Sequence, residues 1–226
     1  MPLKFLFKSV KTGINYVSKH PSVIFFNGVI ILLFLLLTVY VKLGGESGHR
    51  SQLIVQLFAE PFTSQRPLQS YLTNLSEILW CFSLAICSFS IGLISHIRPK
   101  RPFNRFILCS ALILAILLID DIFRITLIAN SFLGIPKLFT SLVYGTAIIV
   151  YSLFFRRKIA STPYLLLLIA FGLFVISSLV SSLPLPGQGT PTMLEDGTKL
   201  LALVNLAYYF WYVCQNEVLS AKTRSW

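Results

Sequence analysis

Residues 106–128 read FILCSALILAILLIDDIFRITLI. From Phe106 to Ile119 this stretch contains no charged residue. A helix needs about 20 predominantly apolar residues to cross a bilayer, so the stretch predicts a transmembrane helix. Its charged residues, Asp120, Asp121 and Arg124, come close to its end. Charge inside a membrane is costly unless it is paired, hydrated or turned to the protein interior, so these three residues are candidates for a functional site.

The composition of the whole chain supports the same class of protein. The chain has 226 residues, of which 55% are hydrophobic and 12% are charged. A soluble domain has roughly 25% charged residues, so this chain has too few to cover a water-exposed surface. Low-complexity disorder is excluded as well, because such chains are poor in aromatic residues and this one has 14%. We therefore predict an all-α integral membrane protein.

Six apolar runs are predicted to cross the membrane. They are Ser22–Leu43, Ser76–Ile97, Phe106–Ile128, Leu138–Phe155, Pro163–Leu183 and Met193–Cys214. The first run is too long for the apolar part of a cleaved signal peptide, and it is interpreted as an anchor. The predicted organisation is a basic segment over residues 1–21, a six-span bundle over 22–215 with an external loop at 44–75, and a short cytoplasmic tail at 216–226.

The basic residues set the predicted orientation. The 19 Lys and Arg residues exceed the 8 Asp and Glu residues, for a net charge of +11. Nucleic acid is not predicted as a partner, because the basic residues occur in clusters between apolar runs, as the positive-inside rule expects. The clusters predicted to be cytoplasmic comprise Lys4, Lys8, Lys11, Lys19, Arg98, Lys100, Arg101, Arg105, Arg156, Arg157, Lys158, Lys222 and Arg224. Both termini are therefore expected in the cytoplasm, with the protein in the plasma (inner) membrane.

The segment before the first span has a helical pattern of its own. Its apolar residues recur at spacings of three and four, at Leu3, Phe7, Val10, Ile14 and Val17. Lysines lie beside this stripe, so we expect a basic amphipathic helix on the cytoplasmic leaflet, attracted by anionic lipid. The alternative is an unstructured basic leader that only fixes the topology.

Two other predicted spans bring charge to the same depth as the third. The sixth opens with Glu195, Asp196 and Lys199, and the second opens with Glu77. At 1.5 Å per residue, Asp120 lies about 21 Å above the cytoplasmic end of the third span. That is the outer third of a hydrocarbon core about 30 Å thick. The sixth span starts outside, so its charges lie roughly 3 to 10 Å below the outer boundary. One cluster is therefore expected.

Stripes of polar or small residues suggest how the spans meet, because small side chains allow close approach and polar ones bond across helices. The sixth span has Glu195, Thr198, Lys199, Ala202, Asn205 and Tyr209 on one face. The second has Glu77, Cys81, Ala85, Ser88, Gly92 and Ser95. We expect the second, third and sixth spans to be neighbours, with Asp120 or Asp121 close to Lys199. The spacing of four also allows Asp120 to meet Arg124 and Glu195 to meet Lys199 along their own helices.

The expected cluster has more carboxylates than basic groups. Its members are Asp120, Asp121, Glu195, Asp196, Glu77, Arg124 and Lys199. Surplus negative charge in a low dielectric is neutralised by protons, by a hard cation such as Mg²⁺, Ca²⁺ or Mn²⁺, or by water. We predict a site for a proton, a hard cation or a polar head group. In it Asp121 and Glu195 supply the surplus, Arg124 and Lys199 hold the carboxylates, and Asn205 extends the polar face inward.

A second interpretation stays open, namely a non-catalytic scaffold or assembly subunit in which the same residues form a structural ion-pair network. An enzyme is disfavoured, because no histidine lies near the cluster to act as a base. No cofactor is predicted apart from the divalent cation. The cysteines lie within apolar runs and lack metal-ligand spacing, so zinc, haem and iron–sulfur sites are not expected. The predicted partners are the lipid bilayer, anionic lipid at the basic face and other membrane proteins.

Overall fold

The computed structural model of the chain describes residues 21–44, 52, 56, 71–97, 104–182 and 189–223. Over these residues the protein is all-helical, without a strand. Its helices are α2 (Pro21–Gly44), α4 (Tyr71–Ile97), α5 (Arg105–Phe123), α6 (Ile125–Leu133), α7 (Lys137–Phe154), α8 (Arg156–Ala160), α9 (Tyr164–Ser182) and α10 (Gly189–Thr223). The predicted amphipathic segment at residues 1–21 lies outside the described residues, apart from Pro21, the first residue of α2.

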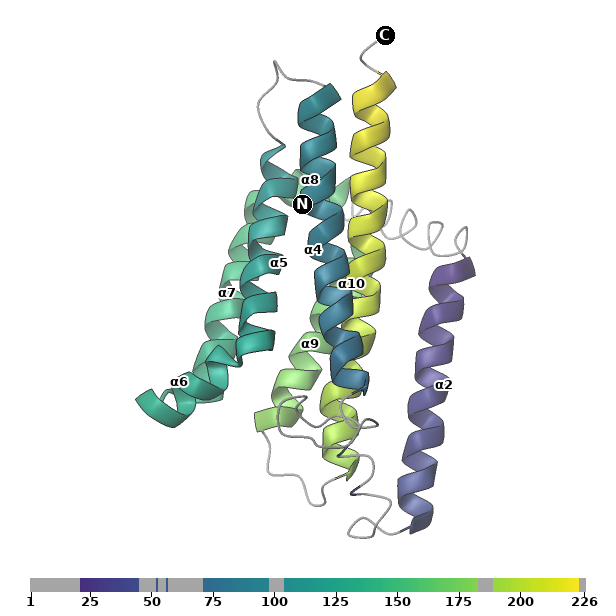
Figure 1. Ribbon diagram of the computed structural model, residues 1–226, viewed down its shortest axis with the longest axis vertical. Helices are drawn as coiled ribbons and strands as arrows, with labels where there is room; N and C mark the ends of the chain where they lie inside the picture. The colour runs from purple at the N-terminus through teal and green to yellow at the C-terminus, as the bar shows by residue number, and fades with distance from the viewer. Residues whose placement is uncertain are drawn as a thin grey trace, which may run out of the picture.

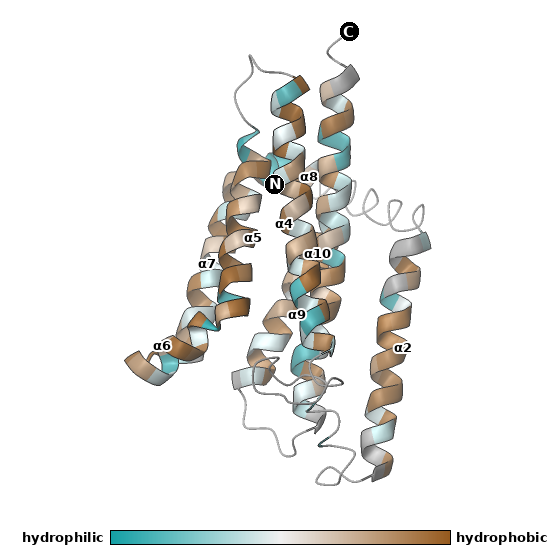
Figure 2. Ribbon diagram, in the orientation of Figure 1, coloured by the Kyte–Doolittle hydropathy of each residue, from teal (hydrophilic) through white to brown (hydrophobic). Residues whose placement is uncertain are grey.

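Each of the six apolar runs is helical, the third as two helices, α5 and α6. Three helical stretches are long and apolar enough to cross a membrane, namely Tyr71–Ile97, Arg105–Phe123 and Tyr164–Ser181. Shorter apolar stretches are found at Asn27–Tyr40 in α2 and Leu138–Phe154 in α7, counting described residues alone. Figure 2 shows hydrophobic residues along most of α2, α5, α7 and α9, whereas α10 also has several hydrophilic positions. At its far end α10 continues to Thr223, through most of the predicted tail.

The helices of the six runs point alternately in opposite directions (Figure 1). The end of α4, the start of α5, α8 and the end of α10 lie together at one end of the bundle. We call it the basic end, after Arg105 and residues 156–158. The start of α4, the end of α5 and the early turns of α10 lie at the opposite end. We call it the acidic end, after Glu77, Asp121 and Asp196.

Helix α10 is the centre of the bundle. It packs along α9, α4 and α2, and α4 packs along α5. The core that these helices share includes Leu203 and Tyr209 of α10, Cys87 of α4 and Leu166 of α9, all at most 1% exposed. On α10 the predicted stripe is buried from Ala202 onward. Helix α10 therefore presents its polar stripe to its neighbours, as the sequence predicted.

On α4 the predicted contact stripe is wrong, because its central residues Cys81, Ala85, Ser88 and Gly92 are exposed. The residues that α4 buries instead are Ser76, Trp80, Ser83, Cys87 and Ser90. Ser76 and Ser83 donate their hydroxyl groups to the carbonyl oxygens of Leu72 and Leu79, one turn earlier. Serines that bond back in this way can be buried without an unsatisfied group, and they leave room for Trp80 between them.

The predicted third span, Phe106–Ile128, is interrupted at Arg124. This residue has φ 50°, in the left-handed region, where it ends α5 and precedes α6. Helix α6 turns away from the axis of α5 (Figure 1). A side chain with a Cβ adopts this conformation at a cost of about 1 kcal/mol or more. The sequence has no glycine at this point, so helical periodicity did not reveal the break.

Candidate functional site

An ion pair joins α5 to α10 at the acidic end. The Lys199 ammonium donates to Oδ1 of Asp121, 78 residues away in the sequence. The side chains are 28% and 19% exposed, respectively. The structure thus brings together two charges that were expected at the same depth in the membrane. Helix α4 lies alongside both α5 and α10.

Further carboxylates surround this pair. Glu77, on α4, interacts electrostatically with Asp121, Lys199 and Arg124. Asp196, on α10, interacts with Lys199, Asp121, Arg124 and its neighbour Glu195. Because Asp121 is paired with Lys199, the surplus negative charge falls on Glu77, Glu195 and Asp196. Glu77 and Asp196 therefore carry part of the surplus negative charge that was expected of Asp121.

Asp120 has a different neighbourhood from Asp121, since adjacent residues on a helix point about 100° apart. Its carboxylate accepts hydrogen bonds from the backbone N–H of Thr126 at 2.9 Å and from the Thr126 hydroxyl group at 2.9 and 3.0 Å. The Tyr144 side chain of α7 also interacts with Asp120 and Thr126. Asp120 thus stabilises the first turn of α6 after the break at Arg124. It is not part of the Lys199–Asp121 ion pair.

Asn205 binds another helix rather than extending the cluster. Its amide nitrogen donates to Asn27 Oδ1 of α2 at 2.7 Å, and the Asn27 amide donates back at 3.3 Å. Asn205 also donates to the carbonyl oxygen of Leu201 at 2.8 Å. A reciprocal amide pair of this kind joins helices in an apolar medium. The sequence pattern does not reveal this pair, although Asn27 is the one amide side chain within the first apolar run.

A second polar cluster lies at the basic end. Glu217 of α10 accepts from Lys158 of α8 at 2.9 Å and from Asn104, just before α5, at 3.0 Å. This carboxylate therefore joins three segments of the chain. Glu217 was not predictable as a contact residue, because its partners come from connections between the apolar runs.

The acidic end offers few ligands for a metal ion. Over the described part of the chain, no group of three or more His, Cys, Asp or Glu side chains is placed to hold one. His96, a histidine within the described ranges, lies in the last turn of α4 at the basic end. The arrangement suits charge pairing with a single positive group better than chelation, which needs several oxygen ligands around one point.

Comparison with known proteins gives a family. A family model described as Domain of unknown function (DUF8692) matches residues 24–213. The chain belongs to this family. The matched region extends from α2 to α10 and contains every candidate residue of the acidic end. No curated protein and no solved structure matches the chain.

Proposed function

We propose that the protein is a six-span protein of the plasma (inner) membrane with both termini in the cytoplasm, and that its acidic end binds a positively charged group from outside. The group is a proton, a cationic polar head group or a single hard cation. Three apolar helices, the alternating helix directions and the clustering of basic residues at one end support this topology.

The unequal charge around the Lys199–Asp121 pair carries the binding proposal. Glu77 and Asp196 both act on this pair, while Lys199 is already engaged by Asp121. With Glu195 included, four carboxylates stand against two basic groups, Lys199 and Arg124. This excess of two is unfavourable in a low dielectric, so a bound positive charge stabilises this end of the bundle.

The test is the melting temperature of the purified protein in detergent, measured over a range of pH and with added Mg²⁺, Ca²⁺ or ethanolamine. We expect the wild type to respond to at least one of them. Glu77→Gln combined with Asp196→Asn should keep the fold and lose that response. Glu217→Gln, which removes a carboxylate at the opposite end, is the control and should keep it. A wild type that responds to none of these would refute the proposal.

The second candidate is a non-catalytic scaffold, and one observation favours it. Polar groups in the described bundle repeatedly join one helix to another. Lys199 with Asp121 and Asn205 with Asn27 are two such contacts, and Tyr209 and Thr162, whose hydroxyl oxygens lie 3.1 Å apart, join α10 to the residues before α9. In this case the double carboxamide variant is as stable as the wild type or more stable, because surplus charge is removed.

A further inference from the structure

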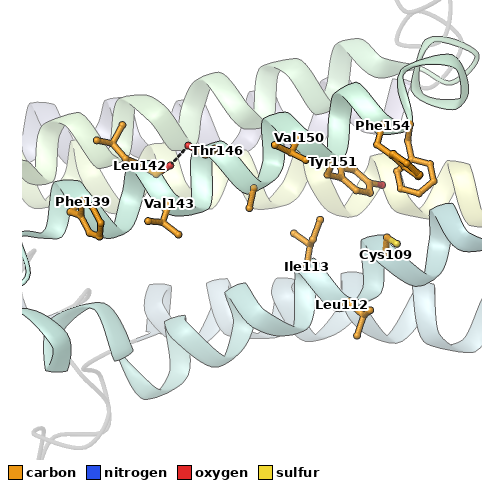
Figure 3. Close-up of a pocket in the computed structure, with 12 residues that line it drawn as sticks. Cys109, Leu112, Ile113, Phe139, Leu142, Val143, Thr146, Val150, Tyr151 and Phe154 are labelled. Atoms are coloured by element: carbon orange, nitrogen blue, oxygen red, sulfur yellow. Dashed lines mark hydrogen bonds between the residues drawn. The ribbon is translucent and has the colours of Figure 1, made fainter.

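An apolar groove lies between α5 and α7, away from the acidic cluster. Its volume is about 840 Å³, within the roughly 300–1,000 Å³ usual for small-molecule sites. Figure 3 shows Cys109 and Ile113 of α5 facing Val143 and Tyr151 of α7 across it. The lining of α7 extends from Phe139 to Phe154, a length of about 22 Å at 1.5 Å per residue. That exceeds the roughly 15 Å depth of one leaflet of the hydrocarbon core.

The groove presents no free polar group to an occupant. The Thr146 hydroxyl donates to the carbonyl oxygen of Leu142. The hydroxyl groups of Tyr151 and Ser110 bond to each other. An occupant of this groove is therefore an apolar chain, held by packing and not by hydrogen bonds.

Helix α7 contacts α5 at two levels, near its end and near its middle. Near the basic end, Phe106 of α5 packs against Tyr151 and Phe155, with ring centroids 6.0 and 5.4 Å apart. Near the middle of the helix, Tyr144 interacts with Asp120. No residue of α7 between these contacts is fully buried. The groove therefore lies along a stretch of α7 whose side chains the other described residues leave partly or fully exposed.

The basic end of the groove carries uncompensated positive charge. The contact between Phe106 and Phe155 brings their sequence neighbours Arg105 and Arg156 to the same end, and Arg157 follows. All three arginines are exposed. Glu217 is the one carboxylate among the described residues at this end, and it accepts from Lys158. This charge is complementary to a phosphodiester at the mouth of an apolar groove.

We propose that the groove and these three arginines form one site for an anionic glycerophospholipid of the cytoplasmic leaflet. An acyl chain lies between α5 and α7, and the phosphate lies among Arg105, Arg156 and Arg157. Arginine suits this position because its planar guanidinium group donates two parallel hydrogen bonds to phosphate. The proposal rests on the membrane placement of the bundle, but not on the acidic cluster, whose variants lie at the other end.

Native mass spectrometry in detergent tests the site, with phosphatidylglycerol and phosphatidylcholine of identical acyl chains added in equal amounts. We expect the wild type to retain phosphatidylglycerol preferentially. Each Arg→Gln substitution at 105, 156 or 157 should reduce this preference by about fivefold, since one basic residue near the surface contributes about 1 kcal/mol. Equal retention of the two lipids by the wild type would overturn the proposal.

Two matched substitutions on α7 test the groove itself. Val143 lines it and Ile149 does not, and both are 50% exposed. Val143→Trp should lower retention of phosphatidylglycerol severalfold, whereas Ile149→Trp should leave it unchanged. Ala147→Leu, a smaller filling of the same groove, is used if Val143→Trp does not give a cooperative melting curve.

Three other outcomes would overturn the proposal. Equal loss of lipid in the Val143 and Ile149 variants would show that the lipid lies elsewhere. Competition by glycerol phosphate as strong as that by the intact lipid would show that only the head group is bound. A dimer that dissociates on Val143→Trp would show that a second copy of the chain occupies the groove.

Discussion

Lys199 and Asp121 meet where water reaches them only in part. Breaking a fully buried pair by removing one partner costs about 3–5 kcal/mol, because the other charge is left uncompensated, whereas replacing both partners together is often neutral. The side chains here are 28% and 19% exposed, so the cost is smaller. Losing the lysine is the more harmful change, because Asp121 then remains beside Glu77 and Asp196.

We predict that Lys199→Met lowers the free energy of unfolding by about 1–3 kcal/mol. Lys199→Met combined with Asp121→Asn should recover most of this loss, because the carboxylate that needed the lysine is gone. Chemical or thermal unfolding in detergent at fixed pH measures both effects.

Lys158 provides the control for this experiment. It pairs with Glu217 at 2.9 Å, but its side chain is 52% exposed. Lys158→Met should therefore cost less than about 1 kcal/mol, as exposed pairs usually do. If Lys199→Met were no more destabilising than Lys158→Met, the pair at the acidic end would have no special role in holding α5 to α10.

The sequence could predict the pair because helix rise gives depth, and depth limits which charges can meet. It could not show which of two adjacent aspartates would pair. That choice depends on the rotation of α5, and rotation is fixed by packing. The partner of Asp120 was hidden for another reason, because Thr126 reaches it only after the chain breaks at Arg124.

At the scale of helices, α2 and α10 are in close contact at Gly197. A Cβ atom at this position would lie 2.9 Å from Cε1 of the Phe34 ring, closer than real Cβ contacts. The ring therefore packs directly on the backbone of α10. Met193, one turn earlier, packs with Phe34 and Leu37 of α2.

We predict that Gly197→Ala weakens the contact between α2 and α10. Overpacking a close contact typically costs about 1–3 kcal/mol, which outweighs the gain of up to about 1 kcal/mol in helix propensity. Phe34→Leu in the same chain should restore stability, because it removes the ring that the new methyl group meets. The unfolding free energies of the single and double variants measure this.

Gly92 on α4 is the matched control for Gly197. A Cβ at Gly92 meets nothing within 4 Å, so Gly92→Ala should be neutral or stabilising. Equal effects of the two alanine substitutions on the free energy of unfolding would mean that α2 does not pack closely against Gly197.

The helices themselves were predictable from the sequence. Which face of each helix is buried was predictable only in part. On α10 the polar stripe is buried because three helices surround it. On α4 the small residues Ala85 and Gly92 face outward, and the larger Trp80 is buried instead. In an apolar solvent, small side chains cost nothing when exposed, so a small-residue stripe alone does not identify a contact.

At the scale of the whole molecule, we predict that both termini are cytoplasmic. A fluorescent reporter fused after Trp226 should be active, whereas an export-dependent phosphatase at the same place should be inactive. The physical reason is the excess of Lys and Arg in the connections at one end. The same two reporters fused after Gly48 should give the reverse result. Phosphatase activity after Trp226 would contradict the orientation and, with it, the assignment of Arg105 and Arg156 to the cytoplasmic leaflet.

The number of apolar runs and their alternation were readable from the sequence, because each run is helical and the connections between them reverse the chain direction. Three of the helices are long and apolar enough to cross a membrane. The order of packing was not readable. Asn27 and Asn205 are 178 residues apart, and nothing in either run shows that α2 lies against α10 rather than against α4 alone.

The central position of α10 has a consequence for biosynthesis. Helices α2, α4 and α9 all leave the ribosome before α10, although α10 is the surface on which each of them packs. While translation continues, the Asn27 amide and the buried face of α4 lack their final partner. A chain that stalled before Gly189 would leave the Asn27 amide without Asn205, its partner on α10, which is unfavourable in lipid. In the completed chain α10 supplies the partner of that amide and covers the buried face of α4.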